Sequence, residues 1–301
     1  MCLDQHYDSS LIELASGVYK EIKYLPGKTG GCVNNNIYFE GLDARAQSLK
    51  DAETILKNQK TCMEELRLVY QCFSVYYPTS NFNSSGYSET FSVAFGEILR
   101  RRPTPLKTRR FAISCKNQNE AMAILPHIDP FSLKILEILF PAKQEHLKFE
   151  KCAKVKFEVD RISETKQWRN AEQLIGNYLI ITTPIQKMSI LHFVNLEILV
   201  ECLSSEDVFY LKTNLLEKPT FQKFRISFPT STIDESLNEL IGEPYRNVPN
   251  IKKVWYFQIP DTDQYMHISL DIHKLMYDNG YPKLKALVVN RVRQEDTPFL
   301  C

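Results

Sequence analysis

Hydrophobic side chains along this chain follow two spacings that alternate with each other. Residues 44–63, ARAQSLKDAETILKNQKTCM, place apolar side chains three and four positions apart, which is the spacing of one helix face. Residues 64–70, EELRLVY, then switch to a period of two, with Leu66 and Leu68 set between charged neighbours. The pattern predicts a helix that leads directly into a strand.

The same helix-then-strand pattern recurs five more times. The predicted pairs are 88–101 with 108–116, 119–129 with 132–140, 162–171 with 172–183, 185–193 with 195–203, and 205–219 with 221–229. Most steps between strand centres lie near the roughly 20–29 residues of a leucine-rich repeat. Helices between short strands favour parallel pairing with right-handed crossovers. We therefore expect an α/β fold, an irregular leucine-rich-repeat-like helix–strand solenoid with a curved, largely parallel sheet and β-rich N- and C-terminal segments.

Four segments are expected along the chain. They are an N-terminal β-hairpin segment (1–45), the first helix–strand units (46–105), a central domain (106–245) and a C-terminal β-rich tail (246–301). No Ser/Gly-rich linker or low-complexity tract separates them, and the 15 prolines are scattered. The segments are therefore expected to form one continuous body.

The charge composition of the chain limits the classes of partner that we expect it to bind. The chain has 37 basic and 36 acidic side chains, a net charge of +1, which gives no global electrostatic reason to bind nucleic acid or an anionic membrane. No apolar run approaches the roughly 18 residues of a membrane span, and the first residues do not resemble a signal peptide. The protein is expected to be intracellular, cytoplasmic or nuclear, without a membrane.

The most prominent charged feature is the stretch LRRRPTPLKTRR at 99–110. Arg100–Arg102 are expected to end a helix, whose exposed carbonyls favour cations. Lys107, Arg109 and Arg110 enter the next strand. A solvated helix end or a protein-contact surface is the favoured interpretation, and nucleic-acid binding or nuclear import is the alternative.

The residues that could support catalysis or bind a metal or cofactor do not form recognisable sites. The stretch GKTGG at Gly27–Gly31 lacks the earlier glycine of a phosphate loop, because Ile22 stands at that position, and it predicts a hairpin turn. The histidines have no partners at ligand spacing. Eight cysteines form no CxxC pair, and no GxSxG motif is present. We expect no catalytic residue, no metal, no cofactor and no enzymatic activity.

Four aromatic residues are assigned structural roles. Trp168 falls at the end of a predicted helix, where it would fill the gap between the helix layer and the sheet rather than stack on a ligand. Trp255 alternates with apolar residues in a strand pattern and receives the same interpretation. His192 and Phe193 lie at a helix-to-strand corner, where a ring nitrogen of His192 is expected to bond to backbone.

Several stretches together resemble a known family. The turn ILPHIDPFSLKILEI, the helix end QWRNAEQL and the His192-Phe193 pair are similar, in order and spacing, to the FTH domain of nematode F-box A proteins. The resemblance covers roughly Leu106–Tyr245. It implies a non-catalytic module that recognises target proteins for ubiquitin-dependent turnover.

Members of this family usually begin with an F-box, a small helical bundle that docks a Skp1-like adaptor and thereby joins a cullin ubiquitin ligase. Met1 falls where that bundle would already have ended, so the F-box is expected to be absent. The resemblance therefore implies a Skp1-like adaptor and a cullin as partners only if an equivalent of the F-box exists. The alternative is a pure protein-interaction module with no link to a ligase.

Alternation along the predicted strands divides side chains between two faces of the sheet. Leu68, Ile113, Ile138, Ile198 and Ile226 would point towards the helices. The candidate protein-binding residues on the opposite, outward face are Arg67, Arg110, Glu137, Glu197, Glu201 and Arg225. Mixed charges on a rigid sheet suit a protein contact. Reversing the charge of all three arginines is expected to abolish partner capture and to change stability by no more than about 1 kcal/mol.

Overall fold

The computed structural model describes part of the chain, in segments whose ranges are 1–5, 10–16, 18–26, 32–34, 37–39, 44–70, 85–139, 156–218, 220–249, 251–275 and 284–298. The chain divides into two compact units. Unit 1 comprises Met1–Leu147 and Thr165–Ala171, and unit 2 comprises Lys148–Glu164 and Glu172–Cys301.

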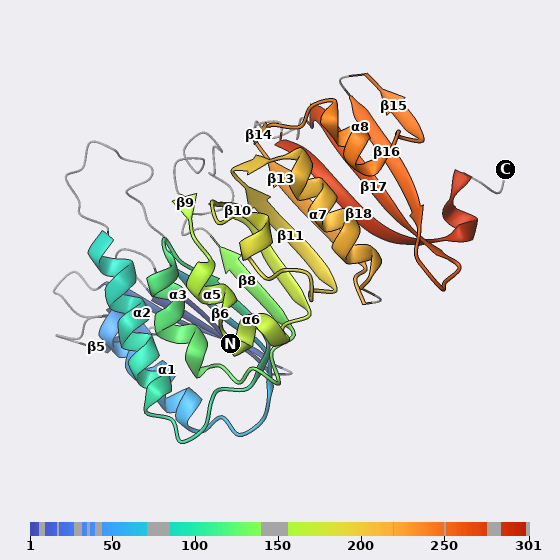
Figure 1. Ribbon diagram of the computed structural model, residues 1–301. Helices are drawn as coiled ribbons and strands as arrows, with labels where there is room; N and C mark the ends of the chain where they lie inside the picture. The colour runs from blue at the N-terminus through green and yellow to red at the C-terminus, as the bar shows by residue number, and fades with distance from the viewer. Residues whose placement is uncertain are drawn as a thin grey trace, which may run out of the picture. The chain divides into compact units, whose positions relative to one another are not determined.

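Unit 1 combines a multi-stranded sheet with short and medium helices (Figure 1). Its strands are β1 (Cys2–Gln5), β2 (Ser10–Ser16), β3 (Val18–Pro26), β4 (Cys32–Asn34), β5 (Ile37–Phe39), β6 (Met63–Tyr70), β7 (Thr108–Ser114) and β8 (Ile135–Leu139). Its helices are α1 (Ala44–Lys57), α2 (Ser85–Arg100), α3 (Gln118–Ile124), the 3-10 helix η2 (Leu125–His127) and α6 (Lys166–Asn170).

The strand order in unit 1 is β8-β7-β6-β1-β2-β3-β4-β5. Neighbours from β8 to β1 are parallel, and neighbours from β1 to β5 are antiparallel. The parallel part follows from the sequence pattern, since α2 and α3 supply the long connections that parallel strands need. β3 and β4 pair on either side of the predicted turn Gly27–Gly31, which itself lies outside the described residues.

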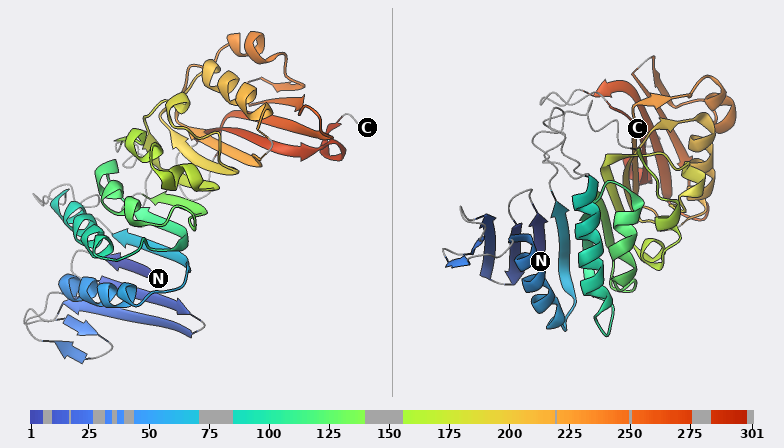
Figure 2. Two further views of the ribbon diagram at one scale, coloured as in Figure 1. Left: turned by 60° about the horizontal axis from the view of Figure 1, so that its bottom comes forward. Right: turned by 90° about the vertical axis from the view of Figure 1, so that its left-hand side faces the viewer.

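Helices α1, α2 and α3 lie side by side on one face of the unit 1 sheet (Figures 1 and 2). The sheet residues that face them form two rows across β6, β7 and β8, namely Leu66, Phe111 and Leu136, then Leu68, Ile113 and Ile138. All six are at most 3% exposed. Burying one such side chain contributes about 1.5–3 kcal/mol, so this layer forms the core of unit 1.

Gly96 sets how closely α2 approaches α3. A Cβ atom at this position would lie 2.2 Å from the backbone oxygen of Ala123. Because that atom belongs to the backbone of the next helix, it has little freedom to move aside. The contact therefore requires glycine in α2, despite the poor helix propensity of that residue.

Unit 2 also pairs a sheet with helices. Its strands are β9 (Lys156–Phe157), β10 (Gln173–Ile181), β11 (Asn195–Val200), β12 (Cys202–Leu203), β13 (Lys223–Phe228), β14 (Thr230–Ser231), β15 (Arg246–Val248), β16 (Lys252–Gln258), β17 (Gln264–Leu275) and β18 (Leu284–Arg293). Its helices are α5 (Asp160–Ser163), α7 (Ser205–Leu216), α8 (Ser236–Ile241) and the 3-10 helices η4 (Ile185–Lys187) and η5 (Gln294–Asp296).

The strand order in unit 2 is β15-β16-β17-β18-β13-β11-β10, with β9 beside β10 and a separate pair β12-β14. Pairing is parallel among β9, β10, β11 and β13 and antiparallel from β13 through β18 to β15. α7 begins with a capping box in which Ser204 and Asp207 bond to each other's backbone nitrogens. Each unit thus has a parallel region flanked by an antiparallel region.

Helices α7 and α8 lie on one face of the unit 2 sheet (Figure 1). Trp255 of β16 marks that face, because its indole nitrogen donates a hydrogen bond of 2.8 Å to the carbonyl oxygen of Gly242, at the end of α8. Gly242 has a φ of +93°, a conformation that favours glycine. The strand register then assigns Ile268, Val289 and Phe224 to the same face as Trp255.

Two of the predicted helices differ from the structure. The helix expected at 162–171 is two short helices, because Thr165 has extended backbone and caps α6 by accepting a hydrogen bond from the Trp168 nitrogen. The helix expected at 185–193 is only the three-residue η4. Ser189 has a positive φ of 51°, which prevents the turn from extending as a right-handed helix.

The mixed α/β architecture with large sheets is confirmed. The leucine-rich-repeat-like solenoid stays an interpretation, as do the segment ranges 1–45, 46–105, 106–245 and 246–301. Among the described residues, no helix has both the length and the apolar character needed to cross a membrane.

Candidate protein-binding face

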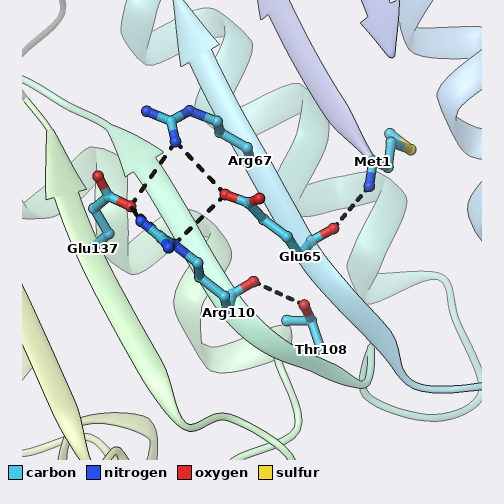
Figure 3. Close-up of polar contacts among 6 residues, drawn as sticks. All are labelled: Met1, Glu65, Arg67, Thr108, Arg110 and Glu137. Carbon is cyan, nitrogen blue, oxygen red and sulfur yellow. Dashed lines mark hydrogen bonds and ion pairs between the residues drawn. The ribbon is translucent and has the colours of Figure 1, made fainter. Parts of the chain in front are cut away.

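Four charged side chains gather on the face of the unit 1 sheet opposite to the helices (Figure 3). Glu65 of β6 is the register partner of Arg110 of β7. Arg67 of β6 is aligned with Ala112, which is aligned with Glu137 of β8. We call Glu65, Arg67, Arg110 and Glu137 the charge cluster.

The charge cluster is internally paired. Arg110 donates to Glu137 Oε2 from Nε at 3.1 Å and from Nη2 at 2.5 Å. Glu65 Oε1 lies 3.6 Å from Arg110 Nε and 3.6 Å from Arg67 Nη1. Arg67 Nη1 in turn lies 4.0 Å from Glu137 Oε2. Each charge therefore has two neighbours of opposite sign, and the cluster is neutral as a whole.

Burial within the charge cluster is uneven. The Glu137 side chain is only 8% exposed, whereas those of Arg67 and Arg110 are 31% and 35% exposed. Glu137 lies on the predicted face, where it is buried against the two guanidinium groups. The hydrogen bond to Glu137 raises the pKa of Arg110. Arg110 thus stays charged and compensates a carboxylate that has lost most of its water.

Backbone contacts fix the strands that carry the charge cluster. The nitrogen of Met1 donates to the carbonyl oxygen of Glu65 at 2.7 Å, beside the parallel pairing of β1 with β6 (Figure 3). Thr108 Oγ1 donates to the carbonyl oxygen of Arg110 at 2.8 Å. The charged side chains therefore project from a hydrogen-bonded sheet rather than from loops, which limits their freedom.

The predicted residues of unit 2 form a looser arrangement. Glu197 of β11 and Arg225 of β13 are register partners on the face opposite to Trp255, and Arg225 Nε lies 3.9 Å from Glu197 Oε1. Their side chains are 46% and 28% exposed. Glu201 follows the end of β11 and pairs instead with Lys156 of β9, at 2.7 Å. Glu201 therefore has a different partner from the Glu197–Arg225 pair.

The basic stretch at 99–110 is largely neutralised. Its arginines meet carboxylates in four of five cases, with the pairs Arg100–Glu97 at 2.6 Å, Arg101–Glu53 at 2.8 Å, Arg109–Glu64 at 3.6 Å and Arg110 in the charge cluster. Arg102 instead donates to the carbonyl oxygen of Gln59 at 3.3 Å. α2 ends at Arg100, as the charge pattern predicts. The arginines of this stretch therefore do not form a row of free cations that could follow a phosphate backbone.

Three of the aromatic residues given structural roles, Trp168, Trp255 and Phe193, are buried. Trp168 is 0% exposed, and the neighbouring Gln167 donates a 2.6 Å hydrogen bond to the carbonyl oxygen of Ile128, which ties α6 to the start of the loop before β8. Trp255 is 2% exposed and Phe193 is 0% exposed. The ring centroids of His192 and Phe193 lie 4.1 Å apart. Neither indole presents a face to a surface ligand.

Cys62, Cys115 and Cys202 of the described residues are free thiols rather than disulfides. No group of three or more His, Cys, Asp or Glu side chains in this part of the chain is placed to hold a metal ion. Cys115 is buried beside Glu120, and burial raises the pKa of its thiol well above its ordinary value, which disfavours the reactive thiolate. Cys62 and Cys202 are exposed.

Glu65 is a member of the charge cluster that does not appear among the candidate residues predicted from the sequence. The alternation that selects Arg67 also selects Glu65, two positions earlier on β6, so the pattern does contain a signal for it. Lys156 carries no such signal, because β9 is a two-residue strand whose place beside β10 follows only from the fold.

Comparison with known proteins gives one result. Searches of curated proteins and of solved structures each found no match. The family model of the FTH domain matches residues 89–240, half of the chain, and overlaps the range Leu106–Tyr245 that resembles this family. This match includes Arg110 and Glu137 of the charge cluster and both Glu197 and Arg225. The chain therefore belongs to the FTH domain family.

Proposed function

We propose that this protein is a non-catalytic protein-recognition scaffold, corresponding to the substrate-binding part of an F-box A ubiquitin-ligase adaptor. The observation that carries the proposal is the FTH match over residues 89–240, together with the position of paired arginines and glutamates within it. These residues occupy sheet faces opposite to the helix layers of the two units. A rigid sheet face with half-buried arginines suits protein contact, where arginine is enriched.

Exposure and ion-pair distances indicate which arginines would contact a partner protein. Arg67 is 31% exposed and only 4.0 Å from Glu137, and Arg225 is 28% exposed and 3.9 Å from Glu197. Both guanidinium groups are thus partly exposed and lie farther from these carboxylates than Arg110 does from Glu137, at 2.5 Å, a pair that is committed to the fold. We therefore assign partner contact to Arg67 and Arg225 and a supporting role to Arg110 and Glu137.

Two versions of the proposal differ in what the scaffold is linked to. In the first, it delivers its target to a Skp1-like adaptor and a cullin for ubiquitin-dependent turnover. In the second, it is a pure protein-interaction module with no ligase link. Affinity purification of the tagged full chain distinguishes them: Skp1-like and cullin subunits are recovered with the target in the first version, and the target alone in the second.

The assignment of Arg67 and Arg225 is tested with the double variant Arg67→Ala/Arg225→Ala. The matched control is Lys57→Ala/Lys218→Ala, which removes one exposed positive charge from the end of α1 in unit 1 and one from beyond α7 in unit 2. We expect the arginine variant to lose at least about three-quarters of the recovered partner, since arginine is a frequent hot spot. Equal recovery by both double variants would contradict the proposal.

A further inference from the structure

A row of aromatic rings lies on the same face of the unit 2 sheet as Glu197 and Arg225, towards its antiparallel end. Tyr256 of β16 is the register partner of His267 of β17, and their ring centroids are 5.0 Å apart. Tyr245, immediately before β15, places its ring 5.7 Å from Tyr256 at an interplanar angle of 84°. Because neighbouring Trp255 points to α8, Tyr256 points away from the helices.

The outer end of this row is exposed apolar surface. Tyr245 is 56% exposed, whereas Tyr256 and His267 are partly covered. Ile251, at the other end of β15, is 48% exposed. β15 is the edge strand of the sheet. Two of the three most exposed large apolar side chains in the described part of unit 2 therefore lie on either side of it in the sequence.

Basic side chains accompany these apolar groups. Arg246 of β15 is exposed, and its register partner Val254 lies on the same side of the sheet as Tyr256. Lys252 of β16 shares that face and lies 3.5 Å from Asp271. Burial and then the charge of Lys252 lower the pKa of His267, which is partly offset by Asp271. The neutral form of this imidazole is thereby favoured, so that it can both donate and accept hydrogen bonds.

We propose that the edge formed by Tyr245, Arg246, Ile251 and Lys252 binds an extended acidic polypeptide segment that carries an aromatic or large apolar side chain. An apolar side chain of the segment packs on Tyr245, just before the start of β15, and carboxylates of the segment meet Arg246 and Lys252. This inference rests on the proposed protein-recognition function and adds the chemistry of the partner.

The same features disfavour single-stranded nucleic acid. Bases need open aromatic faces, yet Tyr256 has a ring on each side, Tyr245 and His267. Phosphates need a longer track of cations than the two basic side chains of this edge, Arg246 and Lys252. Tyrosine and arginine at a sheet edge are instead typical of contacts with polypeptides.

The test uses the purified full chain and a fluorescently labelled, glutamate-rich copolymer of glutamate and tyrosine, with binding measured by anisotropy. We expect the copolymer to bind more tightly than polyglutamate, and polyuridylate to bind more weakly than either. Tyr245→Ala is expected to weaken copolymer binding at least about fivefold, as for an interface hot spot. Arg246→Ala is expected to weaken it about two- to threefold and to reduce its salt dependence.

Phe209→Ala provides the matched control, because Phe209 is 39% exposed on α7, on the opposite side of the sheet. Copolymer binding that is undetectable, or unchanged in Tyr245→Ala, overturns the inference. Tighter binding of polyuridylate that is lost in Tyr245→Ala overturns it in favour of nucleic acid. If either result occurs while the wild type captures a partner that Arg67→Ala/Arg225→Ala loses, the proposed function stands and only this inference fails.

Discussion

The charge cluster of unit 1 and the Glu197–Arg225 pair of unit 2 use the same residue types on equivalent sheet faces, but in different surroundings. In unit 1 the acceptor Glu137 is 8% exposed and receives two hydrogen bonds from Arg110. In unit 2 the acceptor Glu197 is 46% exposed and its nearest guanidinium nitrogen is 3.9 Å away. The first arrangement leaves a costly buried charge if one partner is removed, whereas the second leaves a solvated one.

The difference separates a buried pair that holds the fold from a more exposed pair. A buried carboxylate such as Glu137 needs its arginine at all times, so Arg110 has little capacity to contact a partner. Arg225 and Glu197 are more exposed, and in the proposed function their sheet face is the one that contacts another protein. Charge on a sheet face is therefore not by itself a sign of a binding site, and burial has to be considered with it.

The largest expected effect is that of Arg110→Ala. Removing this guanidinium leaves Glu137 buried with only Arg67, at 4.0 Å, and we expect a loss of about 3 kcal/mol in the free energy of unfolding. Guanidinium chloride unfolding followed by Trp168 fluorescence in a Trp255→Phe background reports on unit 1, because the two tryptophans of the chain lie in different units.

Arg67→Ala is the matched control for Arg110→Ala. It removes the contacts of Arg67 with Glu137 at 4.0 Å and with Glu65 at 3.6 Å but leaves both hydrogen bonds between Arg110 and Glu137 in place, so the loss should stay below about 1 kcal/mol. Equal losses in the two variants would show that the pairing in the charge cluster is not what stabilises unit 1.

Gly96→Ala is expected to lower the free energy of unfolding by less than Arg110→Ala does. It tests the helix layer on the other face of the sheet from the charge cluster. The added Cβ would lie 2.2 Å from the Ala123 oxygen, and overpacking of this kind costs about 1–3 kcal/mol. This cost outweighs the gain of up to about 1 kcal/mol from better helix propensity. We expect a net loss of about 1–2 kcal/mol by the same unfolding assay. A stabilised variant would mean that α2 and α3 do not approach so closely.

The smallest effect is expected from Arg225→Ala. Because Glu197 remains well solvated, the change in the free energy of unfolding should be at most about 0.5 kcal/mol, followed by Trp255 fluorescence in a Trp168→Phe background. A loss near that of Arg110→Ala would remove the contrast between the two faces.

The structure changes one expectation drawn from the sequence, namely that reversing the charge of Arg67, Arg110 and Arg225 together leaves stability nearly unchanged. In unit 1 the reversal would place acidic side chains beside the buried Glu137, so a lost interaction could not be told from a lost fold. Truncation of Arg67 and Arg225, with Arg110 kept, avoids this difficulty.

Alternation along the strands predicts the two sheet faces well. Leu68, Ile113, Ile138, Ile198 and Ile226, expected to point inward, are all at most 3% exposed. A period of two fixes which side chains share a face, whatever the strand order. The same alternation assigns Arg67, Arg110 and Glu137 to one face from the sequence alone.

Other features depend on contacts between distant segments, which a single sequence does not reveal. The parallel pairing of β1 with β6 joins residues more than sixty positions apart, and nothing in the sequence of β1 indicates its partner. The burial of Glu137 depends on its surroundings in the folded protein, and the Tyr245–Tyr256–His267 row needs three separate segments to come together. The short η4 shows that apolar spacing alone does not ensure a helix, since Ser189 adopts a positive φ.

The central claim is that a partner protein contacts the sheet face that carries Arg225, opposite to α7. A photo-crosslinking amino acid placed at Lys223, an exposed residue of β13 on that face, tests it without altering Glu197 or Arg225. The control position is Thr213, exposed on α7. We predict a crosslinked partner from position 223 that is absent from position 213 and is lost when Arg67→Ala/Arg225→Ala is added. Crosslinking from position 213 alone would contradict the account.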